Sequence, residues 1–145
     1  MRVVIDTSTF IKAMLERDRI AWNCIRNLMV SSFILMNREM AKELFVAIYQ
    51  VAGRKGKNPL PAFRIASSIL LYVIPVETET KFPWCSDPDD AMFVECAIDG
   101  KADLVISNDH SLTGIKEYVV DEHAMKLICG IKFVTPAEYL KMHTG

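Results

Sequence analysis

Two acidic residues follow short apolar runs that have the composition of buried β-strands. Residues 3–5 are Val-Val-Ile and lead into Asp6, and residues 104–106 are Leu-Val-Ile and lie three positions before Asp109. Continuous apolar runs of this kind are typical of strands buried on both faces of a parallel sheet. In open α/β sheets, ligands bind outside the carboxyl ends of such strands. If the two strands are neighbours, Asp6 and Asp109 therefore meet in one crevice.

Two further acids are placed by predicted helices. Glu43 lies at the edge of the apolar stripe of its helix, from where its side chain can reach over the carboxyl edge of the sheet. Asp90 falls on the core-facing side of the helix that it opens, which a simple helix cap does not require. Asp87 has the spacing of a capping box, so we interpret it as a cap. Asp103 lies at the opposite end of its strand from the crevice and is interpreted as structural.

Each of these acids alone has an ordinary explanation as a cap, a turn residue or a solvated side chain. Together, four acids around one crevice, with no His pair or Cys cluster in the sequence, favour a site for a hard cation. Carboxylate oxygens suit Mg²⁺ or Mn²⁺. Such an ion can make a nucleophile of water and stabilise the leaving oxygen of a phosphodiester. The four acids are Asp6, Glu43, Asp90 and Asp109.

The elements that must position these acids alternate between predicted strands and predicted helices, which indicates a parallel sheet with helices on both faces. We expect an α/β fold in one domain over residues 1–145, a three-layer α/β/α sandwich around a mostly parallel sheet of about five strands. Pro75 cannot donate to a ladder on both sides, so its strand is expected at an edge. The predicted strands are 2–5, 33–36, 72–76, 104–106 and 131–134.

Capping residues indicate where the helices begin. Ser8 or Thr9 is expected to cap a helix that starts near Phe10, and Asn37 is expected to cap the next long helix. Residues 114–130 are the least regular part of the sequence, and we expect one helix and its connections there. Further helices are predicted to start near residues 20, 61, 87 and 135.

Composition restricts the class of protein. The chain has 145 residues, 51% of them hydrophobic, and a formal net charge of -1 from 17 basic and 18 acidic residues. This balance argues against a strongly basic nucleic-acid-binding module. No apolar run approaches the ~20 residues of a membrane span and no secretory leader is recognisable, so we expect a cytoplasmic protein with no membrane segment. The cysteines are widely spaced and are expected to be reduced core thiols: Cys24, Cys85, Cys96 and Cys129.

The order of these features resembles the PIN-domain family, and within it the VapC-like ribonuclease toxins of toxin–antitoxin systems. The resemblance covers nearly the whole chain. Two positions depart from the family pattern, because Ser8 stands where Asn is frequent and Asn37 stands where Ser is frequent. The segments that carry the resemblance are Val3-Val4-Ile5-Asp6-Thr7-Ser8, Glu43-Leu44, Asp87-Pro88-Asp89-Asp90, 102–112 and 135–140.

The resemblance implies a Mg²⁺- or Mn²⁺-dependent ribonuclease, a phosphodiester hydrolase that cleaves RNA with activated water in an acidic pocket. Ser8 and Ser107 are expected to support the carboxylates by hydrogen bonds. The expected partners are RNA, an antitoxin protein that covers apolar ground near the first helices, and a second copy of the chain in a homodimer. The implied catalytic residues are Asp6, Glu43, Asp90 and Asp109, of which Asp6, Asp90 and Asp109 are the implied metal ligands.

Contacts to RNA require cations near these acids. Lys12 and Arg38 each follow the carboxyl end of a predicted strand and are the preferred candidates. The basic run at residues 54–57 is either a further RNA contact or a solvated loop. Trp22 and Trp84 either stack on bases or pack against the core or a partner protein.

Two other classes of function stay open. An apolar strand that ends in Asp-Thr also opens aspartate-based phosphohydrolases of the haloacid-dehalogenase type. In the class that this opening resembles, an acid two residues after the nucleophile acts as acid and base. This chain has Ser8 at that position, so the class is disfavoured. The other is a catalytically silent PIN-fold regulator that binds RNA or protein. The residues at positions 8 and 37 favour it, whereas the retention of four acids argues against it.

Overall fold

A five-stranded sheet lies at the centre of the computed structural model, which describes residues 1–144. Its strand order is β3-β2-β1-β4-β5, and every neighbouring pair is parallel. The predicted sheet and the edge position of the strand with Pro75 are confirmed, although that strand is shorter than predicted. The strands are β1 (Arg2–Ile5), β2 (Phe33–Met36), β3 (Ile74–Pro75), β4 (Leu104–Ile106) and β5 (Lys132–Val134).

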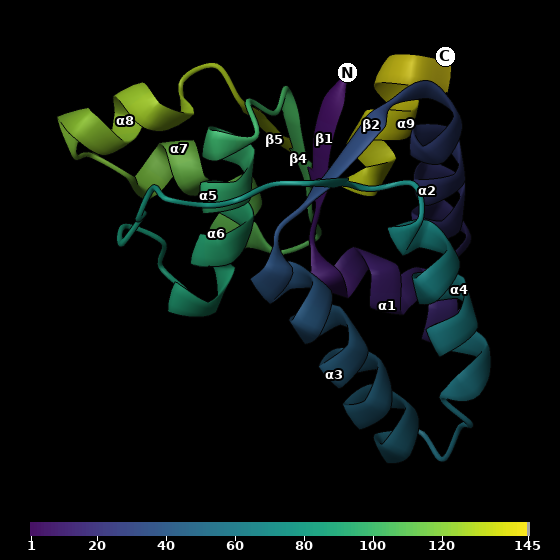
Figure 1. Ribbon diagram of the computed structural model, residues 1–145. Helices are drawn as coiled ribbons and strands as arrows, with labels where there is room; N and C mark the ends of the chain where they lie inside the picture. Colours follow the sequence, from purple (N-terminus) through teal and green to yellow (C-terminus); the bar gives the residue numbers. More distant parts are fainter. Residues whose placement is uncertain (145) are drawn as a thin grey trace.

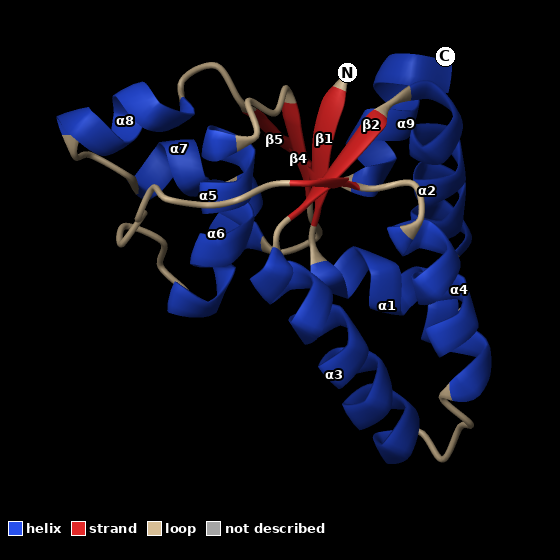
Figure 2. Ribbon diagram, viewed as in Figure 1, coloured by secondary structure: helices blue, strands red, loops and turns tan. Residues whose placement is uncertain are grey.

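Helices cover both faces of this sheet and complete the predicted three-layer sandwich (Figures 1 and 2). They are α1 (Thr7–Leu15), α2 (Arg19–Ser31), α3 (Arg38–Arg54), α4 (Leu60–Leu70), α5 (Ala91–Asp99), α6 (His110–Thr113), α7 (Ile115–Tyr118), α8 (Glu122–Ile128) and α9 (Pro136–Thr144), with a 3₁₀ turn, η1 (Pro88–Asp90), before α5. In Figure 1, α5 lies on one side of the sheet and α2 and α9 lie on the other. Within residues 1–144, no helix has both the length and the apolar composition needed to cross a membrane.

β1 is the central strand and determines where the sheet can bind a ligand. Val4 is in register with Leu35 of β2 and with Val105 of β4, and all three side chains are buried. β2 and β3 lie on one side of β1, and β4 and β5 lie on the other, so the direction in which the chain adds strands to the sheet reverses at β1. Such a reversal opens a crevice at the carboxyl ends of the strands. β1 and β4 are neighbours in the sheet, which was the condition for Asp6 and Asp109 to meet in one crevice.

The start of α1 differs from the prediction. Neither Ser8 nor Thr9 caps the helix, which begins at Thr7 instead of near Phe10. Asp6 is the cap, because its carboxylate accepts a hydrogen bond from the backbone N–H of Thr9 at 3.0 Å. An Asp directly after a strand can satisfy one of the free N–H groups of the first turn, so Asp6 is the single residue needed between the strand and the helix. The first acid of the candidate site is thus fixed by both elements.

The start of α3 agrees with the prediction and links two helices. The side-chain oxygen of Asn37 accepts from the backbone N–H of Met40 at 2.8 Å, which makes Asn37 the predicted cap. Its amide nitrogen donates to the backbone carbonyl of Met92 at 3.0 Å. One buried side chain therefore fixes the start of α3, which carries Glu43, against the start of α5.

The segment 114–130 forms two short helices, α7 and α8, where one was predicted. Asp121 caps α8 through the backbone N–H of Ala124 at 2.9 Å. Within the described residues all four cysteines are free thiols, as expected. Cys129, however, is exposed after α8, so the prediction of a core position is wrong for this residue.

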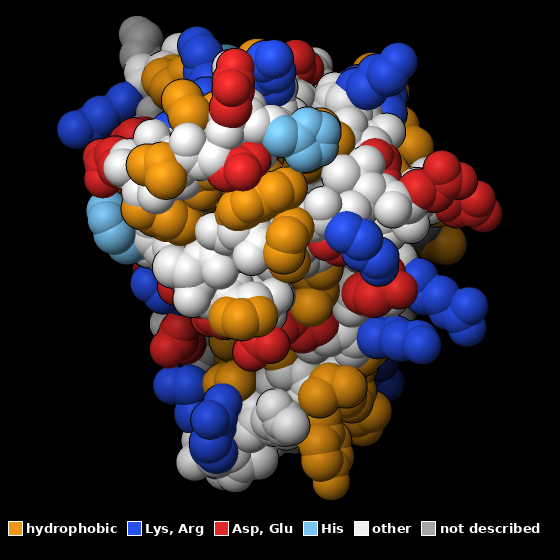
Figure 3. Space-filling model, turned by 90° about the vertical axis from the view of Figure 1, so that its left-hand side faces the viewer, with side chains coloured by type: hydrophobic (Ala, Val, Ile, Leu, Met, Phe, Trp, Pro, Cys, Tyr) orange, Lys and Arg blue, Asp and Glu red, His pale blue; other side chains and the backbone are white. Residues whose placement is uncertain are grey.

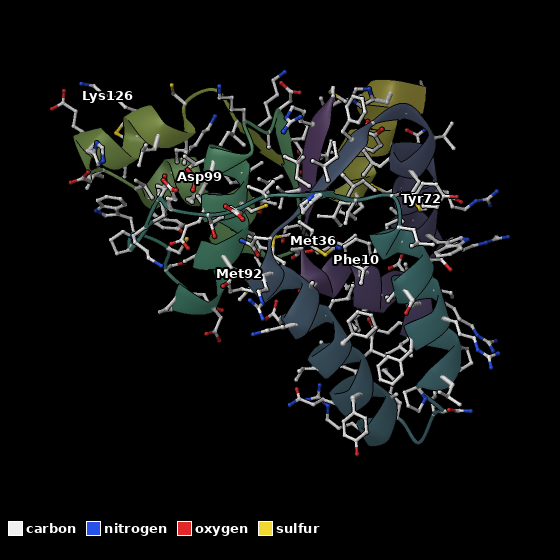
Figure 4. The ribbon with its side chains drawn as sticks, in the orientation of Figure 1. Phe10, Met36, Tyr72, Met92, Asp99 and Lys126 are labelled. Carbon is white, nitrogen blue, oxygen red and sulfur yellow. The ribbon has the colours of Figure 1, made fainter. Side chains whose placement is uncertain are left out.

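The long connection from β3 to η1 passes over α5 and is fixed by acids of that helix (Figures 1 and 4). Asp99 accepts hydrogen bonds from the backbone N–H groups of Glu79 at 2.7 Å and Thr80 at 2.9 Å, and from the Thr80 hydroxyl. Glu95 accepts from the backbone N–H of Phe82 at 2.8 Å. The side chain of Phe82 is buried in the core. These contacts determine the path of the chain toward the acids of η1.

We predict that Asp99→Asn destabilises the protein by about 1 kcal/mol at pH 7, because hydrogen bonds to a charged acceptor are weakened on a partly exposed surface. Burial raises the pKa of Asp99, but the donors from Thr80 and Glu79 outweigh it and lower the pKa below its usual value. The contribution of the carboxylate is therefore present above the unfolded pKa and is lost as pH falls through the folded pKa. Urea unfolding of the variant at pH 7 and pH 3 measures this. Glu77→Gln, at an exposed acid of the same connection, is the control and is expected to leave stability unchanged.

Candidate functional site

A cleft of about 360 Å³ opens where the carboxyl ends of β1 and β4 meet α1, α3 and η1. Among the described residues that line it, seven are acidic and one, Lys12, is basic. Figure 3 shows several acidic side chains in a band across the middle of one face of the molecule. The acids that line the cleft are Asp6, Glu16, Glu43, Asp87, Asp89, Asp90 and Asp109. All four predicted catalytic acids are therefore in one cleft.

Asp6 is buried and accepts hydrogen bonds from four described donors. One oxygen, Oδ1, accepts from the backbone N–H of Thr9 at 3.0 Å and from its hydroxyl at 2.6 Å. The other, Oδ2, accepts from the hydroxyls of Ser8 at 2.7 Å and Ser107 at 2.6 Å. A carboxylate has about four acceptor positions, so these donors satisfy it fully. Both serines that were predicted to support the acids do contact Asp6.

Ser107 joins the ends of the two central strands. Its hydroxyl donates to Asp6 and accepts from the backbone N–H of Asp109 at 2.9 Å, and its side chain is completely buried. Its own backbone N–H donates to the carbonyl of Val134 in β5 at 3.0 Å. One hydroxyl thus fixes Asp6 and the backbone of Asp109 relative to each other.

The two acids on helices are also held by hydroxyl groups. The Thr7 hydroxyl, in the first turn of α1, donates to Glu43 Oε2 at 2.6 Å. The Ser111 hydroxyl in α6 donates to Asp90 Oδ2. Each of these acids is therefore oriented by an element other than its own.

The acids of the cleft raise each other's pKa values. Burial, together with the charges of Asp87, Asp109 and Asp6, raises the pKa of Asp90 from 3.8 to about 6, although the Ser111 hydrogen bond acts in the opposite direction. The pKa of Asp109 is also raised, by burial and then by the charge of Asp6, while Lys12 lowers it. Concentrated negative charge of this kind is relieved by a cation.

The donor chemistry of the cleft fits a divalent cation such as Mg²⁺ or Mn²⁺, because carboxylate and hydroxyl oxygens surround it and thiols and imidazoles do not line it in the described residues. The positions of the carboxylates are less suited to an ion than their chemistry is. Within the described part of the chain, no group of three or more His, Cys, Asp or Glu residues already has the arrangement of a metal site. Asp6, Glu43 and Asp90 each point to a hydroxyl partner. An ion could therefore bind free acceptor positions of Glu43 and Asp90, whereas at Asp6 it would displace one of the four donors.

The predicted substrate contacts are placed differently. Lys12 lines the cleft near Asp109. Arg38 is exposed at the start of α3 and is not among the described residues that line the cleft, so its contact with RNA stays a prediction. Lys57, in the basic run, donates to the carbonyl of Leu15 and thereby binds the end of α1.

Lys55 lies 3.6 Å from Glu16 at the far end of the cleft, so the basic run adjoins the site without lining it in the described residues. Trp84 packs edge-on against Phe82 and His123, with ring centroids 5.1 Å and 6.0 Å away. These contacts favour a packing role for Trp84 over base stacking.

Sequence reasoning missed several residues of the cleft. Asp87 caps η1 through the backbone N–H of Asp89, as predicted, yet both side chains also line the cleft. The run of acids at the start of this helix indicated that they could belong to the site. Capping alone was enough to explain the run, so Asp87 and Asp89 were not assigned to the site. The hydroxyls of Thr7 and Ser111 gave no signal, because their roles depend on contacts with residues far away in the sequence.

Comparison with known proteins identifies the family. Residues 2–111 match the family model described as the PIN domain, so the chain belongs to the PIN domain family. Its members with the VapC fold are nucleases and generally use divalent metal ions. No curated protein matches the chain in sequence.

Two solved structures share the fold. One is VapBC2 from Rickettsia felis bound to a DNA fragment from its promoter, with a TM-score of 0.58 and 14% identity over 93% of this chain and 98% of that chain. The other is VapBC-1 from nontypeable Haemophilus influenzae, with a TM-score of 0.56 and 13% identity over 94% of this chain and 99% of that chain. At sequence identities of 14% and 13%, the similarity shows a shared fold and nothing more.

Proposed function

We propose that this protein is a Mg²⁺- or Mn²⁺-dependent endoribonuclease and the toxin of a cytoplasmic toxin–antitoxin pair. The observation that carries the proposal is the cleft at the β1–β4 junction, where seven carboxylates face one lysine in the described residues. A structural role does not explain this arrangement, because like charges in one cleft destabilise a fold unless a cation relieves them.

The residues divide into three roles. Asp6, Asp90 and Asp109 hold the cation, which when bound would lower the pKa of water and neutralise charge on the scissile phosphodiester. Glu43, which lines the same cleft, accepts a hydrogen bond from the attacking water and orients it. Lys12 binds a phosphate oxygen of the RNA at the edge of the acids. The hydroxyls of Ser107 and Ser8 keep Asp6 in place.

An antitoxin partner is supported by the two similar structures, which are VapBC complexes. A second hollow, of about 260 Å³, lies where α1, α2 and α4 meet and combines apolar side chains with charged ones. Met14 and Trp22, apolar residues of the first two helices, line it, whereas Met29 of α2 is not among the described residues that do. We place the antitoxin on this hollow. Exposed apolar residues such as Val46 and Tyr49 on α3 support a homodimer.

The test is cleavage of a mixed-sequence single-stranded RNA by the purified protein. We expect cleavage with Mn²⁺ or Mg²⁺ and none after chelation with EDTA, with recovery when the ion is restored. A DNA strand of the same sequence is the control and is expected to stay intact. Cleavage that persists in EDTA would contradict the metal-dependent mechanism.

The alternative is a PIN-fold regulator that binds RNA or protein without cleaving it. The specific observation in its favour is that the described acids do not yet converge as a metal site. RNA that is bound in the presence of Mn²⁺ but never cut would favour this alternative over the nuclease.

A further inference from the structure

Two segments that carry acids of the cleft are joined by a residue outside the family match. Tyr118, at the end of α7, lies beyond the matched residues 2–111. Its hydroxyl donates to the backbone carbonyl of Ser111 at 2.6 Å and accepts from the backbone N–H of Ser86 at 3.1 Å. Ser86 directly precedes Asp87, the first acid of the η1 turn. Ser111 follows Asp109 by two residues.

The first of these contacts acts on Asp90 through Ser111. The Ser111 hydroxyl donates to Asp90 Oδ2, while its carbonyl accepts from Tyr118. α6, which carries Ser111, is a single short turn with a glycine directly after it, so it has little rigidity of its own. α7 lies beside it (Figure 1) and supplies this additional bond.

The second contact acts on the η1 turn. The connection before it is fixed to α5 as far as Phe82, and the Trp84 ring packs on Phe82. Beyond that point, the backbone N–H of Ser86 donates to the Tyr118 hydroxyl directly before the acidic run begins. The carboxylates of η1 and of Asp109, which directly precedes α6, repel one another, which favours separation of the two segments unless a bond opposes it.

We propose that Tyr118 is a positioning residue, whose single hydroxyl sets the separation between the η1 acids and the Asp109–Ser111 turn and thereby prepares the cleft for a cation. The inference rests on the proposed function in that the cation is the ligand concerned. A rigid aromatic ring, partly buried against the core, suits the role, because little side-chain freedom is lost when both bonds form. A site whose ligands are already placed binds its ion more tightly than one that must be assembled.

Tyr118→Phe tests this, because the variant keeps the ring and removes both hydroxyl bonds. Tyr139→Phe is the matched control, since the buried Tyr139 donates its hydroxyl to Asn27 between α9 and α2, away from the cleft. The first measurement uses metal-free protein and follows amide hydrogen exchange at Ser86. We expect faster exchange in Tyr118→Phe and no change in Tyr139→Phe. Unchanged exchange at Ser86 in Tyr118→Phe would overturn the inference.

The second measurement is the Mn²⁺ dissociation constant by calorimetry, with the electron paramagnetic resonance spectrum of the bound ion. We expect Tyr118→Phe to weaken Mn²⁺ binding by about 10-fold and to alter the spectrum, as loss of an outer contact does at other metal sites. Tyr139→Phe is expected to bind as the wild type does. If both variants match the wild type, Tyr118 has no positioning role although the proposed function stands. If the wild type binds no Mn²⁺, the proposed function fails and the inference with it.

Discussion

Asp6→Asn is expected to abolish both Mn²⁺ binding and RNA cleavage while the protein stays folded. The carboxylate charge at the junction of β1 and β4 is lost, and cleavage should fall by at least about 100-fold, the usual effect of removing one electrostatic contact at a reaction centre. Folding should survive, because the Asn side-chain oxygen can still cap α1 and the surrounding hydroxyls can turn to accept from the new amide. Asp109→Asn is expected to have the same effect on cleavage.

Thermal unfolding with increasing Mn²⁺ separates binding from folding. Ligand linkage stabilises the wild type by about 2.7 kcal/mol at an ion concentration 100 times the dissociation constant, and the Asn variant should gain nothing. Asp121→Asn is the matched control, because Asp121 caps α8 as Asp6 caps α1 but lies outside the cleft. A variant at Asp6 that still cuts RNA as fast as the wild type would refute the role of this acid.

Asp90→Asn is expected to stabilise the metal-free protein and to weaken its response to Mn²⁺. Burial and the neighbouring acids raise the pKa of Asp90 to about 6, which means that its charged form destabilises the fold. An uncharged side chain of the same shape avoids this cost. Because the cleft is open to solvent, we expect a gain of about 1–2 kcal/mol at pH 7, below the full value of the shift.

The pH dependence has a definite direction. The folded protein binds more protons at Asp90 than the unfolded chain does between pH 3.8 and about 6, so the contribution of Asp90 to wild-type stability falls as pH rises through this window. The advantage of Asp90→Asn is therefore complete above about pH 6 and absent below pH 3.8. Urea unfolding of both proteins across this range measures it, with Asp103→Asn, outside the cleft, as the control. A variant that is less stable than the wild type at pH 7 would contradict the assignment.

The sequence was informative where a local pattern and a topological rule coincide. The apolar run before Asp6 and the run before Asp109 indicated parallel strands, and the binding rule for open sheets then predicted that the two acids meet. The cap at Asn37 was predictable because capping depends on neighbours in the chain. The start of α1 was predicted wrongly, since the cap was assigned to Ser8 or Thr9 and Asp6 to chemistry, although a carboxylate can serve both purposes.

The remaining features depend on contacts across the fold. Nothing within residues 114–130 indicates that Tyr118 contacts Ser86, 32 positions earlier. The same holds for Thr7 and Glu43, which are 36 positions apart. Short helices such as α7 and α8 have little intrinsic stability, so tertiary packing decides where they begin and end. Hydrophobic periodicity could not define them.

The four donors that surround Asp6 make cation binding at this carboxylate an exchange reaction, while Glu43 and Asp90 each keep one hydroxyl partner. A bond between the ion and Asp6 replaces a bond from Ser8, Thr9 or Ser107, so the affinity reflects the difference between the two. Glu43 and Asp90 each accept from one described hydroxyl and keep acceptor positions for the ion. The same hydroxyls allow the charged cleft to persist when the ion is absent, because each of these carboxylates keeps a donor. The protein can therefore fold first and acquire its ion afterwards, with occupancy that follows the free cation concentration around it.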